Sequence, residues 1–157
     1  MVVVFSSFYH LGLLQSRTHE IWARAQGSTL KGDLRYTNTT IFETFPFPLS
    51  GGAYSPRDAP NGGAADRLTG AAEDFDRLRS ALCRERSLGL TKIHNLLRNR
   101  ELPDLVSAYE GMNDAVDACY GFPVGTWRDA NETLLLLLKL NREVSEPVNV
   151  RRDRSAN

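Results

Sequence analysis

Three charged side chains early in the chain have the types and spacing to contact nucleic-acid bases. Lys31, Asp33 and Arg35 alternate across a turn that Gly32 permits. Residues two apart on an extended segment point the same way, so these side chains can project together. Arg and Lys suit the acceptor atoms of guanine, and a carboxylate suits the amino group of cytosine. The alternative is an exposed turn held by salt bridges, and the residues alone leave both interpretations open.

Further polar residues that could contact DNA follow these three in the sequence, as far as Thr39. Tyr36 and Asn38 follow Arg35 directly, with Thr37 and Thr39 beside them. Such side chains can add phosphate or base contacts, although hydroxyl-rich strands are common without that role. The candidate DNA-binding residues are Lys31, Asp33, Arg35, Tyr36 and Asn38.

Residues that resemble a catalytic or metal site do not complete one. His19-Glu20 starts like H-E-x-x-H, but Ala23 stands where the second His is needed. We therefore interpret His19 as a hydrogen-bonding structural residue. Asp114 and Asp117 share the polar face of a predicted helix, which favours solvated carboxylates over catalytic ones. The sequence predicts neither catalytic residues nor metal ligands.

The first fifty residues should position the candidate set. Apolar spacing predicts one helix over about residues 8–26, with Trp22 in the core and Gly27 as its stop. A strand is expected from about residue 34 to 42. Phe45-Pro46-Phe47-Pro48 should be stiff and extended, because proline neither continues a helix nor donates to a sheet. Such a segment packs a connection tightly or holds a recognition loop in place.

The rest of the chain is expected to be helical. Residues 51–66 form a Gly- and Pro-rich linker. The predicted helices cover residues 67–86, 92–98 (capped by Thr91), 103–120 and 132–143 (capped by Asn131). Five consecutive leucines suggest that the last helix is buried against several partners.

These elements predict an α+β protein, mostly α-helical, with short N-terminal strands followed by a helical segment. Residues 2–5 form the first expected strand. The expected divisions are a recognition-like region over 1–50, the linker over 51–66, the helical segment over 67–145 and a disordered tail over 146–157.

Composition narrows the class of protein. The net charge is zero, which argues against a uniformly basic nucleic-acid binder. Residues 51–100 nevertheless hold nine Arg and Lys against six Asp and Glu, whereas residues 101–157 hold six against ten. Cys83 and Cys119 fit reduced thiols in a cytoplasmic protein. We identify no signal peptide, and the leucine run is far shorter than the roughly 20 residues of a membrane span.

Four stretches also resemble a known family. They are S-x-x-H-x-x-W from Ser16, Arg35-Tyr36-Thr37 followed by Phe45-Pro46-Phe47-Pro48, Gly89 to Asn95 (GLTKIHN), and Asn113 to Gly121 (NDAVDACYG). In order and spacing they resemble the C-terminal region of bacterial single-chain type II restriction-modification enzymes. Those enzymes join a nuclease, an adenine-N6 DNA methyltransferase and a target-recognition domain. The resemblance covers about Phe5 to Glu143. The family often has Tyr at His94 and Leu-Asp at Met112-Asn113.

The resemblance implies the end of a target-recognition domain and the helical segment that follows it. S-adenosylmethionine and Mg²⁺ are implied for the parent family, but not for this chain. No Asn-Pro pair for an N-P-P-Y motif and no P-D…[DE]-x-K cluster occurs in the sequence. The chain alone is therefore not expected to be a complete enzyme.

Two functions stay open at this stage. The first is a DNA-recognition and structural C-terminal fragment that works with DNA and a separate methyltransferase or nuclease polypeptide. A sequence that begins inside an apolar strand is expected for a truncated gene, a split subunit or a mispredicted start. The alternative is a small helical protein-interaction module or an inactive gene remnant.

Overall fold

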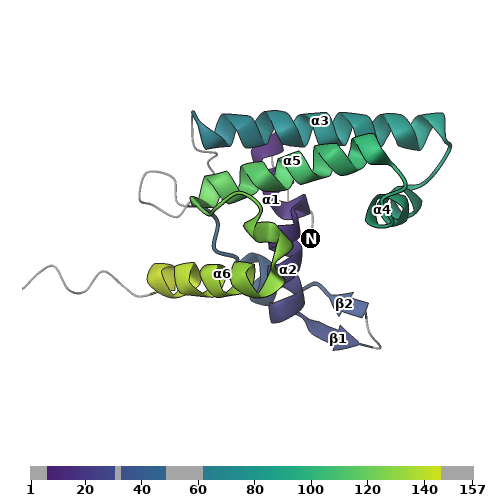
Figure 1. The fold of residues 1–157 in the computed structure, drawn as a ribbon. Helices are drawn as coiled ribbons and strands as arrows, with labels where there is room; N and C mark the ends of the chain where they lie inside the picture. Colours follow the sequence, from purple (N-terminus) through teal and green to yellow (C-terminus); the bar gives the residue numbers. More distant parts are fainter. Residues whose placement is uncertain (1–6, 31–32, 49–61, 146–157) are drawn as a thin grey trace, which may run out of the picture.

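The computed structural model describes residues 7–30, 33–48 and 62–145. The α-helices of this part are α1 (Phe8–Gln15), α2 (Arg17–Gln26), α3 (Ala64–Glu85), α4 (Leu90–Arg98), α5 (Pro103–Tyr120) and α6 (Ala130–Ser145). Strands β1 (Ser28–Leu30) and β2 (Asp33–Arg35) follow α2, a π-helical turn covers Asn38–Phe42, and a 3-10 turn covers Thr126–Arg128. Helices α3 and α5 lie side by side, α1 and α2 lead from this pair toward α6, and the β1–β2 hairpin projects beyond α2 (Figure 1).

The single helix predicted over residues 8–26 is wrong, because the chain bends at Ser16. The Ser16 hydroxyl accepts the backbone N–H of His19 at 3.1 Å and donates to the carbonyl of Leu13 at 2.7 Å. This side chain therefore caps the start of α2 and holds the end of α1. The first N–H of α2, that of Arg17, has no helical acceptor and donates to the buried Asn113 side chain at 2.7 Å. The bend is thereby fixed against α5.

The predicted α+β class is also wrong. The described part is helical, and its extended pairing is confined to the three-residue strands of the β1–β2 hairpin. The strand predicted over residues 34–42 stops at Arg35, and a π-helical turn follows. The Trp22 indole donates to the carbonyl of buried Ile41 inside this turn at 3.2 Å. Thr and aromatic residues favour strands, but this preference depends on pairing and packing. Among the described residues, β2 pairs with β1 alone, and the packing against Trp22 favours the turn.

The Phe45-Pro46-Phe47-Pro48 segment lies in the core. Phe45 and Phe47 are both fully buried, and their rings meet edge to face with centroids 5.0 Å apart. The Tyr120 hydroxyl of α5 donates to the Pro46 carbonyl at 2.9 Å. The stiff segment thus packs a connection tightly, and Trp22 lies in the same core, as predicted.

The long helices match their sequence signals closely. Helix α5 has the predicted bounds, with Pro103 at its start and Gly121 in the left-handed conformation (φ 70°) after its end. Helix α3 begins three residues earlier than predicted. Helix α4 begins at Leu90 with Gly89 at the cap position, so the predicted Thr91 cap is wrong. The pair α3–α5 and the crossing helix α1 share one apolar core.

Helix α6 is capped by Asp129 and not by the predicted Asn131. The Asp129 carboxylate accepts the backbone N–H groups of Asn131 at 2.9 Å and Glu132 at 3.0 Å. Farther along, the Asn141 amide donates to the Thr44 carbonyl at 2.6 Å. This bond ties α6 to the segment just before the buried phenylalanines.

The leucine run of α6 is buried on one face only. Leu137 is fully buried, whereas Leu135 is 68% exposed and Leu138 is 40% exposed. The expectation of burial on every side is therefore wrong, because a helix at the surface packs one face against the core. In the described part, no helix has the length and apolar character needed to cross a membrane.

Some predictions fall outside the described residues. These are the strand over residues 2–5, the turn at Lys31 and Gly32, most of the linker and the disordered tail from residue 146. The division into four regions also stays a prediction.

The contact of α1 with α3 leads to a test at Gly12. A Cβ at this position would lie 2.8 Å from Leu68 Cδ1 and 2.9 Å from Ala72 Cβ. Gly12→Ala should therefore lower the free energy of unfolding by about 1–2 kcal/mol, since overpacking outweighs the gain in helix propensity. Urea denaturation measures this change. Gly70→Ala and Gly111→Ala are matched controls, because a Cβ there meets nothing within 4 Å. They should stabilise by up to about 1 kcal/mol. A stabilised Gly12→Ala would contradict the close packing.

Candidate nucleic-acid interface

The candidate residues lie on one projecting hairpin and the turn after it. Its strands pair antiparallel, with Ser28 opposite Arg35 and Leu30 opposite Asp33. Two residues, Lys31 and Gly32, separate the strands in the sequence. Asp33 and Arg35 occupy alternate positions of β2. Residues 31 and 32 and the side chains of both strands lie outside the described part.

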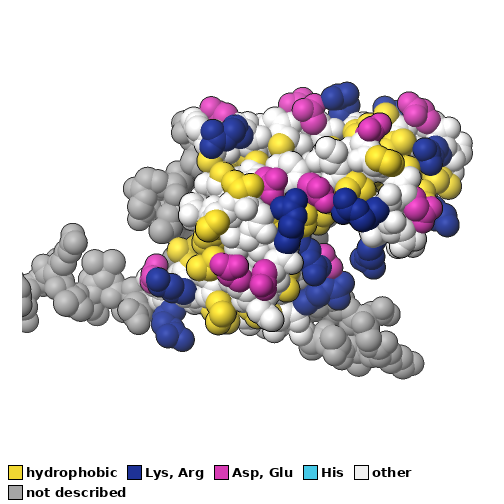
Figure 2. Space-filling view, in the orientation of Figure 1, with side chains coloured by type: hydrophobic (Ala, Val, Ile, Leu, Met, Phe, Trp, Pro, Cys, Tyr) yellow, Lys and Arg dark blue, Asp and Glu magenta, His cyan; other side chains and the backbone are white. Residues whose placement is uncertain are grey.

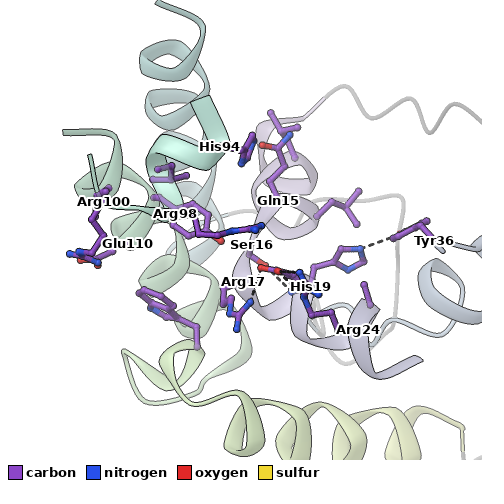
Figure 3. Close-up of a pocket in the computed structure, with 18 of the residues that line it drawn as sticks. Gln15, Ser16, Arg17, His19, Arg24, Tyr36, His94, Arg98, Arg100 and Glu110 are labelled. Atoms are coloured by element: carbon purple, nitrogen blue, oxygen red, sulfur yellow. Dashed lines mark hydrogen bonds and ion pairs between the residues drawn. The ribbon is translucent and has the colours of Figure 1, made fainter. Parts of the chain in front are cut away.

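Tyr36 anchors the root of this hairpin to α2. Its hydroxyl lies 3.1 Å from Nε2 of His19 (Figure 3). The buried His19 ring in turn meets Phe45 edge to face, with ring centroids 4.5 Å apart. Burial lowers the pKa of His19 to about 4, so the ring is neutral at pH 7. Burial also raises the pKa of Tyr36. His19 is the structural hydrogen-bonding residue that the sequence predicts.

Asn38 begins the π-helical turn beyond Tyr36. Its backbone carbonyl accepts the N–H of Glu43 at 2.8 Å, and its side chain is partly buried. Tyr36, by contrast, is 47% exposed and faces a cleft. Of the five candidate residues, Tyr36 alone is among the described residues that line that cleft.

The cleft has a volume of about 1150 Å³ and lies between two groups of helices. Helices α1 and α2 form one wall, and α4 and α5 contribute the other (Figure 3). Its charged lining consists of Arg17, Arg24, Arg98, Arg100, Glu20 and Glu110. Four guanidinium groups against two carboxylates make the cleft cationic at neutral pH, although the whole chain has no net charge.

Carboxylates hold three of these arginines in place. Glu20 forms ion pairs with Arg17 and with Arg24, each at 2.8 Å. Burial would raise the pKa of Glu20, but the hydrogen bonds and charges of the two arginines outweigh it and lower that pKa. Glu110 pairs with Arg100 at 2.9 Å on the opposite wall.

The acidic residues of α5 are structural, and one prediction about them is wrong. Asp117 was expected to be solvated, but it is fully buried and accepts the backbone N–H groups of Gly125 at 2.9 Å and Trp127 at 3.3 Å. Burial raises its pKa, against the opposite effect of these hydrogen bonds. Asp114 accepts the Trp127 indole N–H at 2.7 Å. Within residues 7–30, 33–48 and 62–145, no three His, Cys, Asp or Glu side chains are grouped to hold a metal ion.

The arginines of the second wall were missed at the sequence level. Arg98 and Arg100 meet the α1–α2 bend only through the packing of α4 and α5, which no local pattern encodes. One signal was available, because residues 87–100 contain no Asp or Glu. An acid-free stretch with Lys92, Arg98 and Arg100 is a feature of anion-binding surfaces.

The first third of the chain is similar to a known family of domains. Residues 1–49, which include the hairpin and its anchor, match the family described as "MmeI, target recognition domain". The predicted resemblance to the target-recognition end of restriction-modification enzymes is thereby confirmed.

Two individual proteins match as well. DNA methyltransferase A of Bacillus subtilis (strain 168) is 40% identical over 47 residues, which are 30% of this chain and 5% of that protein. The structure of the type IIL restriction-modification enzyme MmeI in complex with DNA has the same fold over 88% of this chain and 16% of its own, with a TM-score of 0.64 and 20% identity. The chain therefore spans a small part of either protein.

The buried His19 ring predicts an acid-sensitive fold. The unfolded ring binds a proton near pH 6.5, whereas the folded ring stays neutral down to about pH 4. The unfolded state then binds more protons, so the free energy of unfolding should fall by up to about 3 kcal/mol as the pH drops through this window. Urea denaturation across the window measures this fall.

His19→Gln should remove most of that pH dependence, because Gln can keep the contact with Tyr36 but does not titrate. His94→Gln is the matched control, since His94 is exposed at the cleft and its variant should keep most of the slope. If the free energy of unfolding falls equally with pH in the parent protein and in His19→Gln, the buried ring is not the neutral group proposed here.

Proposed function

We propose that this chain recognises a specific DNA sequence through the β1–β2 hairpin. One observation carries the proposal: the hairpin with the candidate base-contacting residues projects beside a cationic cleft, inside the segment that matches target-recognition domains. The MmeI structure with the same fold is a complex with DNA, which supports the same class of ligand for this chain.

The hairpin has the two-stranded form that can enter a major groove. A two-stranded β-ribbon fits this groove, where each base pair presents a distinct pattern of donors and acceptors. Arg35 and Lys31 are assigned to guanine acceptor atoms, and Asp33 to a cytosine amino group. Tyr36 and Asn38 lie at the root of the ribbon, where they can contact sugar and phosphate. The Tyr36–His19 contact fixes the direction in which the ribbon projects.

We assign catalysis to a separate methyltransferase or nuclease part and not to this chain. The chain spans 5% of DNA methyltransferase A and 16% of MmeI, so a methyltransferase or nuclease part that works with it would supply most of such an enzyme. S-adenosylmethionine and Mg²⁺ would bind in that part. The described residues do not fit Mg²⁺ here, because Asp117 and Asp114 are committed to backbone and indole N–H groups. A role of this kind places the chain in the cytoplasm.

A protein-interaction module is the second candidate function. The exposed leucines of α6, Leu135 and Leu138, favour it, because exposed apolar side chains on one helix face can pack against a partner. The two functions differ in their response to salt. DNA binding weakens steeply as the salt concentration rises, because the release of counterions from the phosphates becomes less favourable. Apolar association lacks this dependence.

Selection from a pool of duplexes with a randomised centre tests DNA recognition. The full chain should enrich one sequence. Arg35→Ala should relax the preference at one base pair and cost about 1–3 kcal/mol of discrimination there, because a bidentate contact to guanine is lost. Sequencing of the bound duplexes measures both effects.

Arg142→Ala serves as the control for a lost positive charge. Arg142 lies in the last turn of α6, outside the cleft, and should leave the selected sequence unchanged. A parent chain that enriches no sequence would overturn the proposal. An identical selected sequence for Arg35→Ala would remove this residue from the interface.

A further inference from the structure

Helix α4 exposes a polar face without acidic residues. Ile93 and Leu97 are buried and attach the helix to the body, whereas Lys92, Asn95 and Arg98 are exposed at intervals of three residues. Residues three apart share one side of a helix, so these side chains form a stripe. Neither α4 nor the residues that flank it from 87 to 100 include Asp or Glu. This stripe can receive an anion without competition from its own helix.

Arg98 differs from the other arginines of the cleft. Arg17, Arg24 and Arg100 are each paired with a glutamate, but Arg98 forms no hydrogen bond or ion pair with any residue that the structure describes. It extends from α4 toward the bend between α1 and α2 (Figure 3). Its guanidinium group is therefore available to an external ligand.

The charges around Arg98 add to a positive environment. The pKa of His94, one turn before Arg98, is lowered first by partial burial and then by the positive charges of Arg79 and Arg98, while Glu20 opposes this effect slightly. Glu20 is already shared by two arginines and does not neutralise Arg98.

Helix α4 and the hairpin lie on the same side of the molecule. Figure 1 shows both projecting from the helical body, and in Figure 2 Lys and Arg side chains border the hollow below α4. The cleft connects the two features, because Tyr36 at the hairpin root and Arg98 of α4 both line it. A duplex that presents a groove to the hairpin would bring its sugar–phosphate backbone past α4.

We infer that Arg98 and Lys92 of α4 bind the phosphate backbone of the duplex that the hairpin recognises. This inference rests on the proposed DNA recognition and deepens it by adding a second, sequence-independent contact. Arg offers a planar fork for phosphate oxygens, and Lys a mobile point charge. Such contacts position the protein and add affinity for every sequence equally, whereas the hairpin supplies selectivity. Free phosphate has the same chemistry, and the test separates the two sources.

Fluorescence anisotropy with a labelled duplex of the selected sequence, and with a scrambled duplex, tests the inference. Each neutralised phosphate contributes about 0.9 to the slope of log K against log salt. Arg98→Gln should reduce the slope by about one and weaken binding to both duplexes about eightfold at about 0.1 M salt. Lys92→Gln should act in the same direction. Arg142→Gln, on α6 at the opposite end of the molecule, should change neither value.

The outcomes separate the inference from the proposed function. If selectivity depends on Arg35 but neither Arg98→Gln nor Lys92→Gln changes the salt slope, α4 makes no phosphate contact and DNA recognition stands. If the parent chain binds no duplex, both ideas fail. If inorganic phosphate at millimolar concentration abolishes the effect of Arg98→Gln while duplex binding persists, the site is one for free phosphate and the inference is wrong.

Discussion

The bend at Ser16 is the constraint on which the site depends. A helix that starts in the interior must find acceptors for its first N–H groups, because unpaired buried donors cost about 1–3 kcal/mol each. The Ser16 hydroxyl and the buried Asn113 amide oxygen supply two of them. The second acceptor comes from α5, so the direction of α2 is set by a helix almost a hundred residues away in the chain. From α2 follow the position of His19, the anchoring of Tyr36 and the direction of the hairpin.

The bounds of a helix were predictable where proline or glycine restricts the backbone, but not where a side-chain cap decides the boundary, as Ser16 and Asp129 do. Helix α5 has the bounds that Pro103 and Gly121 indicate, because proline suits the first turn and glycine tolerates the left-handed conformation after the last. The bend at Ser16 was missed because the apolar stripe continues through it at helical spacing. The π-helical turn was missed because the residues that hold it, Trp22 above all, act from another element.

Sequence reasoning reached the local backbone around the candidate residues but not the cleft beside them. The alternation of Lys31, Asp33 and Arg35 predicts a turn between extended segments, and Leu30 pairs with Asp33 across that position. The DNA contacts of these residues stay a prediction. The cleft could not be predicted in the same way, because Arg17 and Arg98 line one cleft only after α4 has packed against the other helices. The burial of Asp117 has a similar cause: its helix position suggested solvent, but the loop after α5 folds back and donates two N–H groups to it.

The two hydrogen bonds that reach the segment around Pro46 bear on how the chain folds as it is synthesised. Tyr120 and Asn141 bind carbonyls that lie 74 and 97 residues earlier. Contacts between such distant residues slow folding, because a long loop must close before they can form. On the ribosome, the first fifty residues would expose Phe45 and Phe47 until α5 and α6 have emerged. At the usual synthesis rate of about 5–20 residues per second, that wait lasts several seconds. During that time the segment with Phe45 and Phe47 is a surface that a chaperone could cover.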